Sequence, residues 1–339
     1  MKVINNRSFL LLSLILGVIM AGSLFGCAAR EQNARAWNEH RNLSKQQLSD
    51  FHSNRIPSVA EDSQDAEALP EMTGDELERS GDLLLSRGNL EKAFVKYDKA
   101  LQLKPDNIRV RYKKGLLFLL GRMNEDAIKE FQGVLEREPG YTLAYKGLGQ
   151  AFFQVKKYDQ AEENFQKAVE LDPKLWKAHN SLGIIHDYRK RYDMAIQEYS
   201  AAISLRPDNG LLYNNLGVSY AMAGENEKAI NAFNKALETK YSGSKVYNNL
   251  GLVLAKSGRY DEALEAFRKG GDEAHAYNNL GCIYLKQGEF DKAISCFEKA
   301  IEINPAFYIK AGENLRKAGA ARSQLPLDDP LTAIFKDLS

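Results

Sequence analysis

The sequence predicts an all-α protein built as a solenoid of helical repeats, and three observations support this. A glycine recurs every 34 residues, an alanine follows each glycine by 12 residues, and an aromatic residue follows each alanine by four. The glycines are Gly81, Gly115, Gly149, Gly183, Gly217 and Gly251, and Gly281 follows after 30 residues. Repeats of this length form small helical units that bury their apolar faces by stacking.

Residues 1–26 have the layout of a bacterial signal peptide. Lys2 and Arg7 precede an uncharged, apolar stretch that runs to Phe25, and Leu24-Phe25-Gly26-Cys27 ends it. This ending resembles the lipobox of bacterial lipoproteins, which implies that Cys27 is lipidated and becomes the first mature residue. The alternative is an uncleaved signal anchor, because about 18 apolar residues can just span a bilayer.

The resemblance to lipoproteins also implies a location in the cell envelope. In the lipoproteins of diderm bacteria an Asp after the lipidated cysteine often signals retention at the inner membrane, and here Ala28 follows Cys27. This favours an outer-membrane anchor facing the periplasm. Residues 27–73 are polar, with two prolines and no sustained apolar periodicity. They predict a flexible tether, in which residues 36–51 could form a short helix.

Residues 74–307 contain seven repeat units. The fifth shows the pattern most fully, with Tyr213, Leu216-Gly217, Tyr220, Ala229 and Phe233. This pattern resembles the tetratricopeptide repeat, which implies two antiparallel helices per unit and a right-handed superhelix with a concave groove. Prolines predict the ends of most second helices, at Pro105, Pro139, Pro173, Pro207 and Pro305.

The end of the array departs from the repeat. The sixth unit ends early, at Gly270-Gly271-Asp272, without a closing proline. Residues 308–321 keep helical character without the Gly, Ala and aromatic of another unit, and we expect a capping helix there. Residues 322–339 contain two prolines and predict an irregular tail, although their apolar residues could form a short docking turn.

The resemblance implies a peptide-binding groove formed by the first helix of each unit. The residues two and three positions before the glycine should line it, and Tyr-Asn-Asn-Leu-Gly occurs there three times in succession. An amide both donates and accepts, so it can match the backbone of an extended peptide. Alternatively, these asparagines only support helix packing. The candidate groove residues are Asn214, Asn215, Asn248, Asn249, Asn278, Asn279, Asn180, Phe153, Ile184, Val218, Met222 and Leu252.

The sequence contains no recognised catalytic, metal-binding or phosphate-binding motif, so we expect neither an enzyme nor a cofactor. His179 and His186 could suggest a metal pair, but neighbouring units carry aromatic residues at these positions, which favours core packing. Cys282 and Cys296 are expected to be free thiols. The formal net charge is +1, with interspersed charges, which argues against nucleic acid as a partner.

The primary hypothesis is therefore a membrane-anchored scaffold that binds protein segments in its groove and no small-molecule substrate. Its architecture resembles the tetratricopeptide lipoproteins that assemble Tad (Flp) pili and type IV pili. That resemblance implies a secretin, or another pilus or secretion subunit, as the partner. The alternatives are an adaptor that recruits cell-wall hydrolases or a protease, and a degenerate enzyme of unrecognised type.

Overall fold

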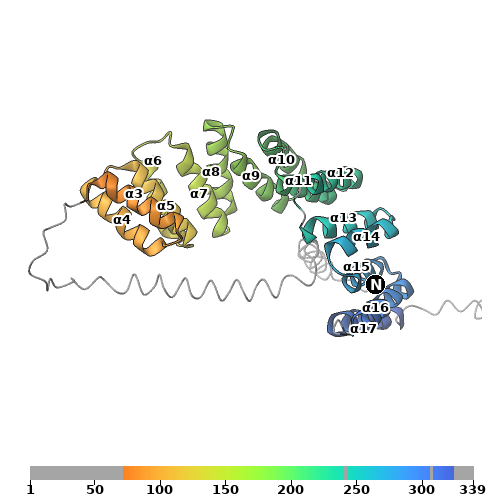
Figure 1. Ribbon diagram of the computed structural model, residues 1–339. Helices are drawn as coiled ribbons and strands as arrows, with labels where there is room; N and C mark the ends of the chain where they lie inside the picture. The colour runs from red at the N-terminus through yellow and green to blue at the C-terminus, as the bar shows by residue number, and fades with distance from the viewer. Residues whose placement is uncertain (1–71, 240, 242, 306–307, 324–339) are drawn as a thin grey trace, which may run out of the picture. The chain divides into compact units, whose positions relative to one another are not determined.

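The computed structural model describes residues 72–323 except 240, 242, 306 and 307, and these form 15 helices and no strand. The predicted signal peptide, Cys27, most of the tether and the C-terminal tail lie outside the described residues. The helices pair as antiparallel hairpins that follow one another along the chain (Figure 1). The predicted all-α repeat solenoid is therefore confirmed. It divides into two compact units, with the boundary between Pro207 and Asp208.

The N-terminal unit contains four hairpins. Their first helices are α3 (Gly74–Ser86), α5 (Ile108–Leu120), α7 (Thr142–Gln154) and α9 (Trp176–Tyr188). Their second helices are α4 (Leu90–Leu103), α6 (Asn124–Leu135), α8 (Tyr158–Leu171) and α10 (Tyr192–Leu205). Thr73 begins the array with a capping box, because its hydroxyl accepts from the Glu76 N–H and the Glu76 side chain accepts from the Thr73 N–H.

The C-terminal unit contains three hairpins and one further helix. The first helices are α11 (Gly210–Ala223), α13 (Ser244–Lys256) and α15 (Glu273–Gln287). The second helices are α12 (Asn226–Glu238), α14 (Tyr260–Gly270) and α16 (Phe290–Ile303), and α17 (Tyr308–Ser323) packs on α16. α14 has 11 residues and ends at Gly270, which lies against α13, where a Cβ would come within 3.1 Å of the Ser244 carbonyl oxygen.

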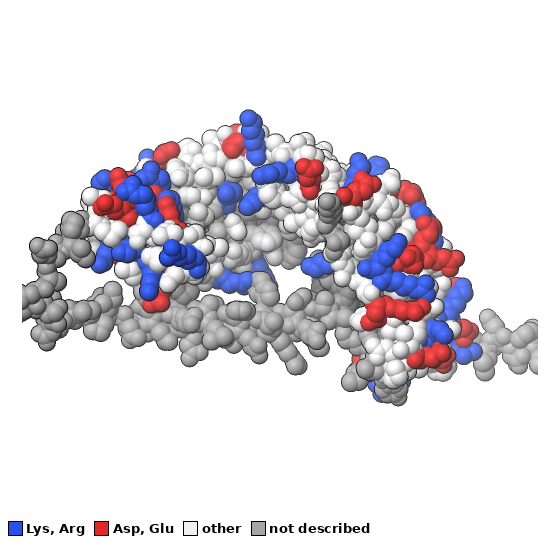
Figure 2. All heavy atoms as spheres, viewed as in Figure 1, with Lys and Arg blue, Asp and Glu red and all other residues white. Residues whose placement is uncertain are grey.

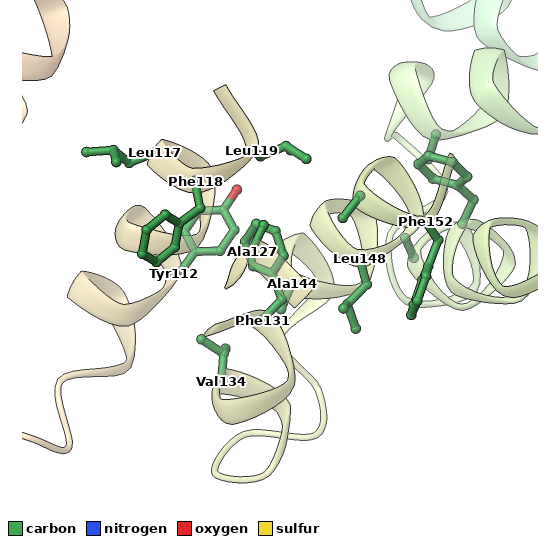
Figure 3. Close-up of a cluster of buried hydrophobic side chains, with 14 of the residues drawn as sticks. Tyr112, Leu117, Phe118, Leu119, Ala127, Phe131, Val134, Ala144, Leu148 and Phe152 are labelled. Atoms are coloured by element: carbon green, nitrogen blue, oxygen red, sulfur yellow. The ribbon is translucent and has the colours of Figure 1, made fainter. Parts of the chain in front are cut away.

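The core of each hairpin is the contact between the repeat glycine and the aromatic ring of the second helix. A Cβ at Gly115 would lie 2.7 Å from Cε1 of Phe131, which is closer than packed atoms approach. The Phe131 ring is fully buried among Tyr112, Ala127 and Ala144 (Figure 3). The glycine is thus required by close helix packing, which explains its recurrence in the sequence.

In the turn between the two helices of every hairpin, one residue has the left-handed backbone conformation, with positive φ. It always stands seven residues after the repeat glycine. Four of these residues are glycines, and Arg122, Lys156 and Lys190 take the same conformation with φ near 60°. A non-glycine residue in this region carries conformational strain. The turn geometry is therefore set by the packing of the helices rather than by the residue that occupies the turn.

Candidate functional site

The structure separates each asparagine doublet of the C-terminal unit into one buried and one partly exposed residue. Asn214, Asn249 and Asn278 are 8%, 7% and 5% exposed. Their doublet partners Asn215, Asn248 and Asn279 are partly exposed. The two members of a doublet therefore have different surroundings, although the sequence repeats them identically.

The buried amides connect successive first helices. Asn249 Nδ2 donates to Asn214 Oδ1 over 3.1 Å, which joins α13 to α11. Asn314 Nδ2 on α17 donates to Asn278 Oδ1 on α15 over 3.1 Å and to Cys282 Sγ over 3.4 Å. A buried amide without a partner is costly, so these pairs fix the spacing and register of the helices they join.

The partly exposed amides lie among partly buried apolar side chains on the same helices. Val218 and Met222 are on α11 and Leu252 is on α13, and Val218 and Leu252 also pack against the core. Amides beside apolar side chains can bind a peptide through its backbone and its side chains together. The candidate surface of this unit is therefore the face formed by the first helices α11, α13 and α15.

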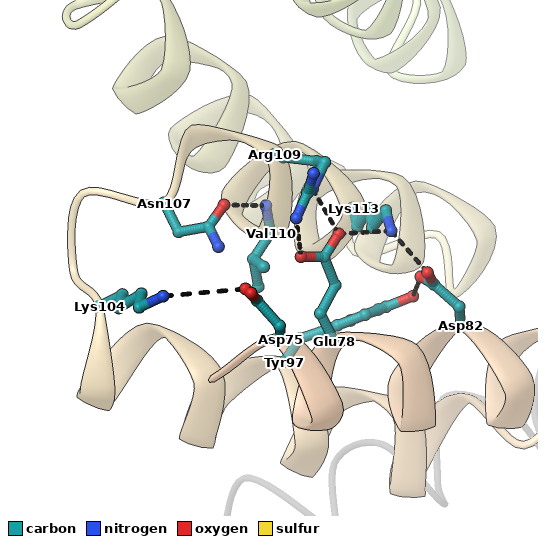
Figure 4. Close-up of polar contacts among 9 residues, drawn as sticks. All are labelled: Asp75, Glu78, Asp82, Tyr97, Lys104, Asn107, Arg109, Val110 and Lys113. Atoms are coloured by element: carbon teal, nitrogen blue, oxygen red, sulfur yellow. Dashed lines mark hydrogen bonds and ion pairs between the residues drawn. The ribbon is translucent and has the colours of Figure 1, made fainter. Parts of the chain in front are cut away.

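In the N-terminal unit the corresponding first-helix positions carry charges (Figure 4). Glu78 on α3 accepts from Arg109 Nε and Lys113 Nζ on α5, each at 2.7 Å. Lys113 also donates to Asp82 over 2.6 Å, and the Tyr97 hydroxyl donates to the same carboxylate over 2.7 Å. Lys113 precedes its glycine by two residues, as Asn249 does, and both reach back to the preceding first helix.

The Glu78 carboxylate stays ionised although it is buried, with 4% of its side chain exposed. Burial would by itself raise its pKa, but the hydrogen bonds from Arg109 and Lys113 outweigh this effect and lower the pKa. This network joins α3 to α5 as the buried amides join the helices of the C-terminal unit.

At the positions two before their glycines, the third and fourth hairpins carry Gly147 and Ser181 instead of an amide or a lysine. The Phe131 ring fills the space beside Gly147, where a Cβ would lie 2.6 Å from Cζ, so no side chain fits there. Ser181 instead donates to its own helix, at the Lys177 carbonyl. The predicted groove residues Asn180, Phe153 and Ile184 are partly exposed on α7 and α9.

Lys146 on α7 is a half-buried cation at this surface, three residues before its glycine. Burial, followed by the charge of Lys177, lowers the pKa of Lys146. No described carboxylate lies within ion-pair distance of either lysine. Sequence reasoning missed the Glu78 network, although Glu78 and Lys113, charged residues 35 positions apart at neighbouring repeat positions, were a usable signal.

The histidines and cysteines occupy packed surroundings. His186 is 1% exposed, and His179 Nδ1 lies 2.7 Å from a Glu198 oxygen. Cys282 and Cys296 are free thiols, and burial raises the pKa of Cys296 to about 11. Within the described part of the chain no cluster of His, Cys, Asp and Glu could hold a metal ion. The helices described there are also too short or too polar to cross a membrane.

Family models match five stretches of the chain, two of which overlap. The model "Tetratricopeptide repeat" matches residues 142–175 and 274–307, and a second model of that description matches 214–272. The model "TPR repeat" matches 81–121 and 188–224. Each of these models describes a repeat.

Among curated proteins, the TPR repeat-containing thioredoxin TTL4 of Arabidopsis thaliana is 26% identical over 105 residues. The match covers 31% of this chain and 15% of that protein. A tetratricopeptide repeat protein from Parabacteroides merdae superposes with a TM-score of 0.52, at 15% identity, over 72% of this chain and 98% of the other. MamA from Desulfovibrio magneticus gives a TM-score of 0.47 at 22% identity, over 50% of this chain and 95% of the other.

Proposed function

The chain carries tetratricopeptide repeats, and we propose that it is a non-catalytic scaffold that binds segments of partner proteins on the first-helix faces. The observation that supports this most is the division of each asparagine doublet. The buried members Asn214, Asn249 and Asn278 join neighbouring helices through hydrogen bonds, while Asn248 and Asn279 are partly exposed.

The charges on the helices favour a partner segment that contains acidic residues. The seven first helices together contain ten Lys or Arg and six Asp or Glu. The seven second helices contain 11 Lys or Arg and 19 Asp or Glu. The near-neutral chain therefore concentrates positive charge on its proposed binding helices, which would attract an acidic segment and suppress basic ones.

We place this scaffold at the outer membrane, facing the periplasm, through lipidation of Cys27. The basis is the sequence of the first 27 residues, and residues 28–73 would give the array its reach. We further propose that the partner is a secretin or another subunit of a pilus or secretion system. The support for this partner is the resemblance in architecture to the lipoproteins that assemble pili.

A crosslinked pull-down from the native envelope tests the binding surface. We would compare the intact protein with Asn248→Ala/Asn279→Ala and with the matched control Asn231→Ala/Asn234→Ala, whose asparagines are exposed on the second helix α12. We expect the first variant to lose the partner and the control to retain it. Retention by both variants would refute the proposed surface. Recovery of cell-wall hydrolases or a protease instead of assembly subunits would refute the assembly role.

A further inference from the structure

The first helix of a hairpin is normally covered by the second helix of the preceding hairpin. The residue three positions after the repeat glycine marks this contact. Phe118 on α5 packs against Phe94 on α4 with ring centroids 5.6 Å apart, and Tyr284 on α15 packs against Tyr260 on α14 at 4.9 Å. His186 at the same position on α9 is buried and lies 3.8 Å from Glu162 on α8. This position therefore belongs to the stacking face.

The corresponding residue of the first hairpin is Leu84, and no described helix covers it. Leu84 lines an open hollow of about 450 Å³ together with Leu83 and Val95. Leu83 is 51% exposed. A terminal repeat of a solenoid needs a cover or a polar outer face, and this face has apolar side chains instead. The other end of the array has α17 as its cover.

The rim of the hollow is basic. Arg87, Lys92 and Lys96 line it, and no acidic residue does. None of these three cations is within ion-pair distance of a described carboxylate. Lys96 Nζ lies 3.6 Å from the Met72 sulfur, which places the entry of the chain into α3 beside this rim. The surface thus combines an apolar floor with a positive edge, and it lies beside Met72, where the described chain enters α3.

That preceding segment has the complementary composition. Residues 59–71 contain five acidic residues and no basic one. Val59, Ala66 and Leu69 are spaced by seven and three residues, so they would share one face of a helix that ends before Pro70. As a helix, residues 59–69 would extend roughly 16 Å, somewhat less than α3, which has 13 residues. Residues 29–55 contain more basic than acidic residues and would suit this rim less well.

We propose that residues 59–71 of this chain bind to the end face of the first hairpin and cap the solenoid. Their apolar side covers Leu83, Leu84 and Val95, and their carboxylates lie beside Arg87, Lys92 and Lys96. The segment takes the place of a preceding second helix. Bound there, it prevents a hairpin of another copy from stacking on the same face.

Hydrogen–deuterium exchange on the full-length chain tests this proposal through a charge swap. We would compare the wild type, Lys92→Glu/Lys96→Glu, and the same pair combined with Asp62→Lys/Asp65→Lys. Lys129→Glu, an exposed position on α6, is the control. We expect residues 59–71 to exchange slowly in the wild type and the control and several-fold faster in the first variant. The combined variant should restore slow exchange, because it restores opposite charges.

Two results would overturn the proposal. Exchange of residues 59–71 at the rate of an unstructured peptide in the wild type would show that the segment leaves the face open. The second result combines slow exchange in α3 and α4 that appears only as the protein concentration rises with a dimer in analytical ultracentrifugation. It would show that a second copy of the chain covers this face. Neither result bears on the first-helix binding surface, so the proposed function is tested separately.

Discussion

At the scale of single residues, the repeat is enforced by contacts that leave no room for an additional carbon atom. A Cβ at Gly217 would lie 2.6 Å from Cε1 and 2.7 Å from Cδ1 of Phe233, whose ring is fully buried. The ring cannot move aside without displacing α12 from α11. Side chains of other sizes are tolerated where the structure is open, as at Gly319 on α17, where nothing lies within 4 Å of an added Cβ.

Gly217→Leu should therefore lower the free energy of unfolding by about 2–3 kcal/mol through overpacking. The matched control is Gly319→Leu, which should change stability little, because its side chain would enter open space. Urea denaturation followed by circular dichroism measures both variants. Equal stability of the two would contradict the assigned packing of the hairpin.

A buried histidine gives the N-terminal unit a defined pH dependence. Burial, followed by the charge of Arg191, lowers the pKa of His186 from 6.5, while Glu162 opposes this shift more weakly and Arg189 adds to it. The folded state therefore disfavours the protonated ring. Since the unfolded chain takes up the proton more readily, stability decreases as the pH falls below 6.5.

His186→Phe should remove this loss, and Phe152 occupies the same place in the preceding hairpin. The difference in Tm between the variant and the wild type should grow as the pH falls from about 7.5 to about 5.5. Thermal unfolding at a series of pH values measures it. A difference that stays constant across this range would show that His186 does not contribute to the acid sensitivity.

At the scale of elements, polar contacts join first helices that the glycine contacts do not reach. In the C-terminal unit these contacts are amide pairs, and between α3 and α5 they are ion pairs centred on Glu78. In both, the acceptor stands three positions before its glycine, as Asn214 and Glu78 do, and a donor two positions before its glycine, as Asn249 and Lys113 do. On α17, Asn314 donates to Asn278 in the same way. If Asn314 is aligned with Asn249, the position of the repeat glycine is occupied by Arg316, which is exposed. A capping helix needs no glycine, because no described second helix packs on it.

Asn249→Ala should destabilise the protein by about 1–3 kcal/mol, because it leaves the buried Asn214 amide without this hydrogen bond. Asn279→Ala, at the partly exposed member of its doublet, should cost about 0.5 kcal/mol or less. Chemical denaturation distinguishes them. If both variants lost the same stability, the exposed asparagines would also be structural, and the proposed binding role would lose its main support.

At the scale of the whole molecule, the charges of both signs are interspersed over the face seen in Figure 2. The two kinds of helix differ in charge instead: Lys and Arg outnumber Asp and Glu in the first helices, and the reverse holds in the second helices. This arrangement suits recognition of a protein segment along the first helices better than binding of a continuous polyanion such as nucleic acid.

The proposed membrane attachment gives a prediction for the full-length chain in its native cell. Cys27→Ser should release the protein from the membrane fraction, because only a cysteine thiol can form the thioether to the lipid. Fractionation followed by immunoblotting measures this. Unchanged fractionation of the variant would instead favour an uncleaved signal anchor, because about 18 apolar residues can span a bilayer without a lipid.

The sequence predicted the hairpins well because each depends on local periodicity and on one repeated close contact. The division within the asparagine doublets could not be predicted, since which amide is buried depends on the neighbouring first helix. Asn248 and Asn249 reverse the order found at Asn214 and Asn215. The Glu78 network was also missed, because a repeat pattern draws attention to residues that recur rather than to those that differ.

The measurement that tests the central claim most directly is hydrogen–deuterium exchange of the chain alone and in complex with the partner captured from the envelope. We predict slower exchange in the complex on the first helices, most of all α11, α13 and α15, with little change on α12, α14 and α16. Protection confined to the second helices would contradict a binding surface on the first helices.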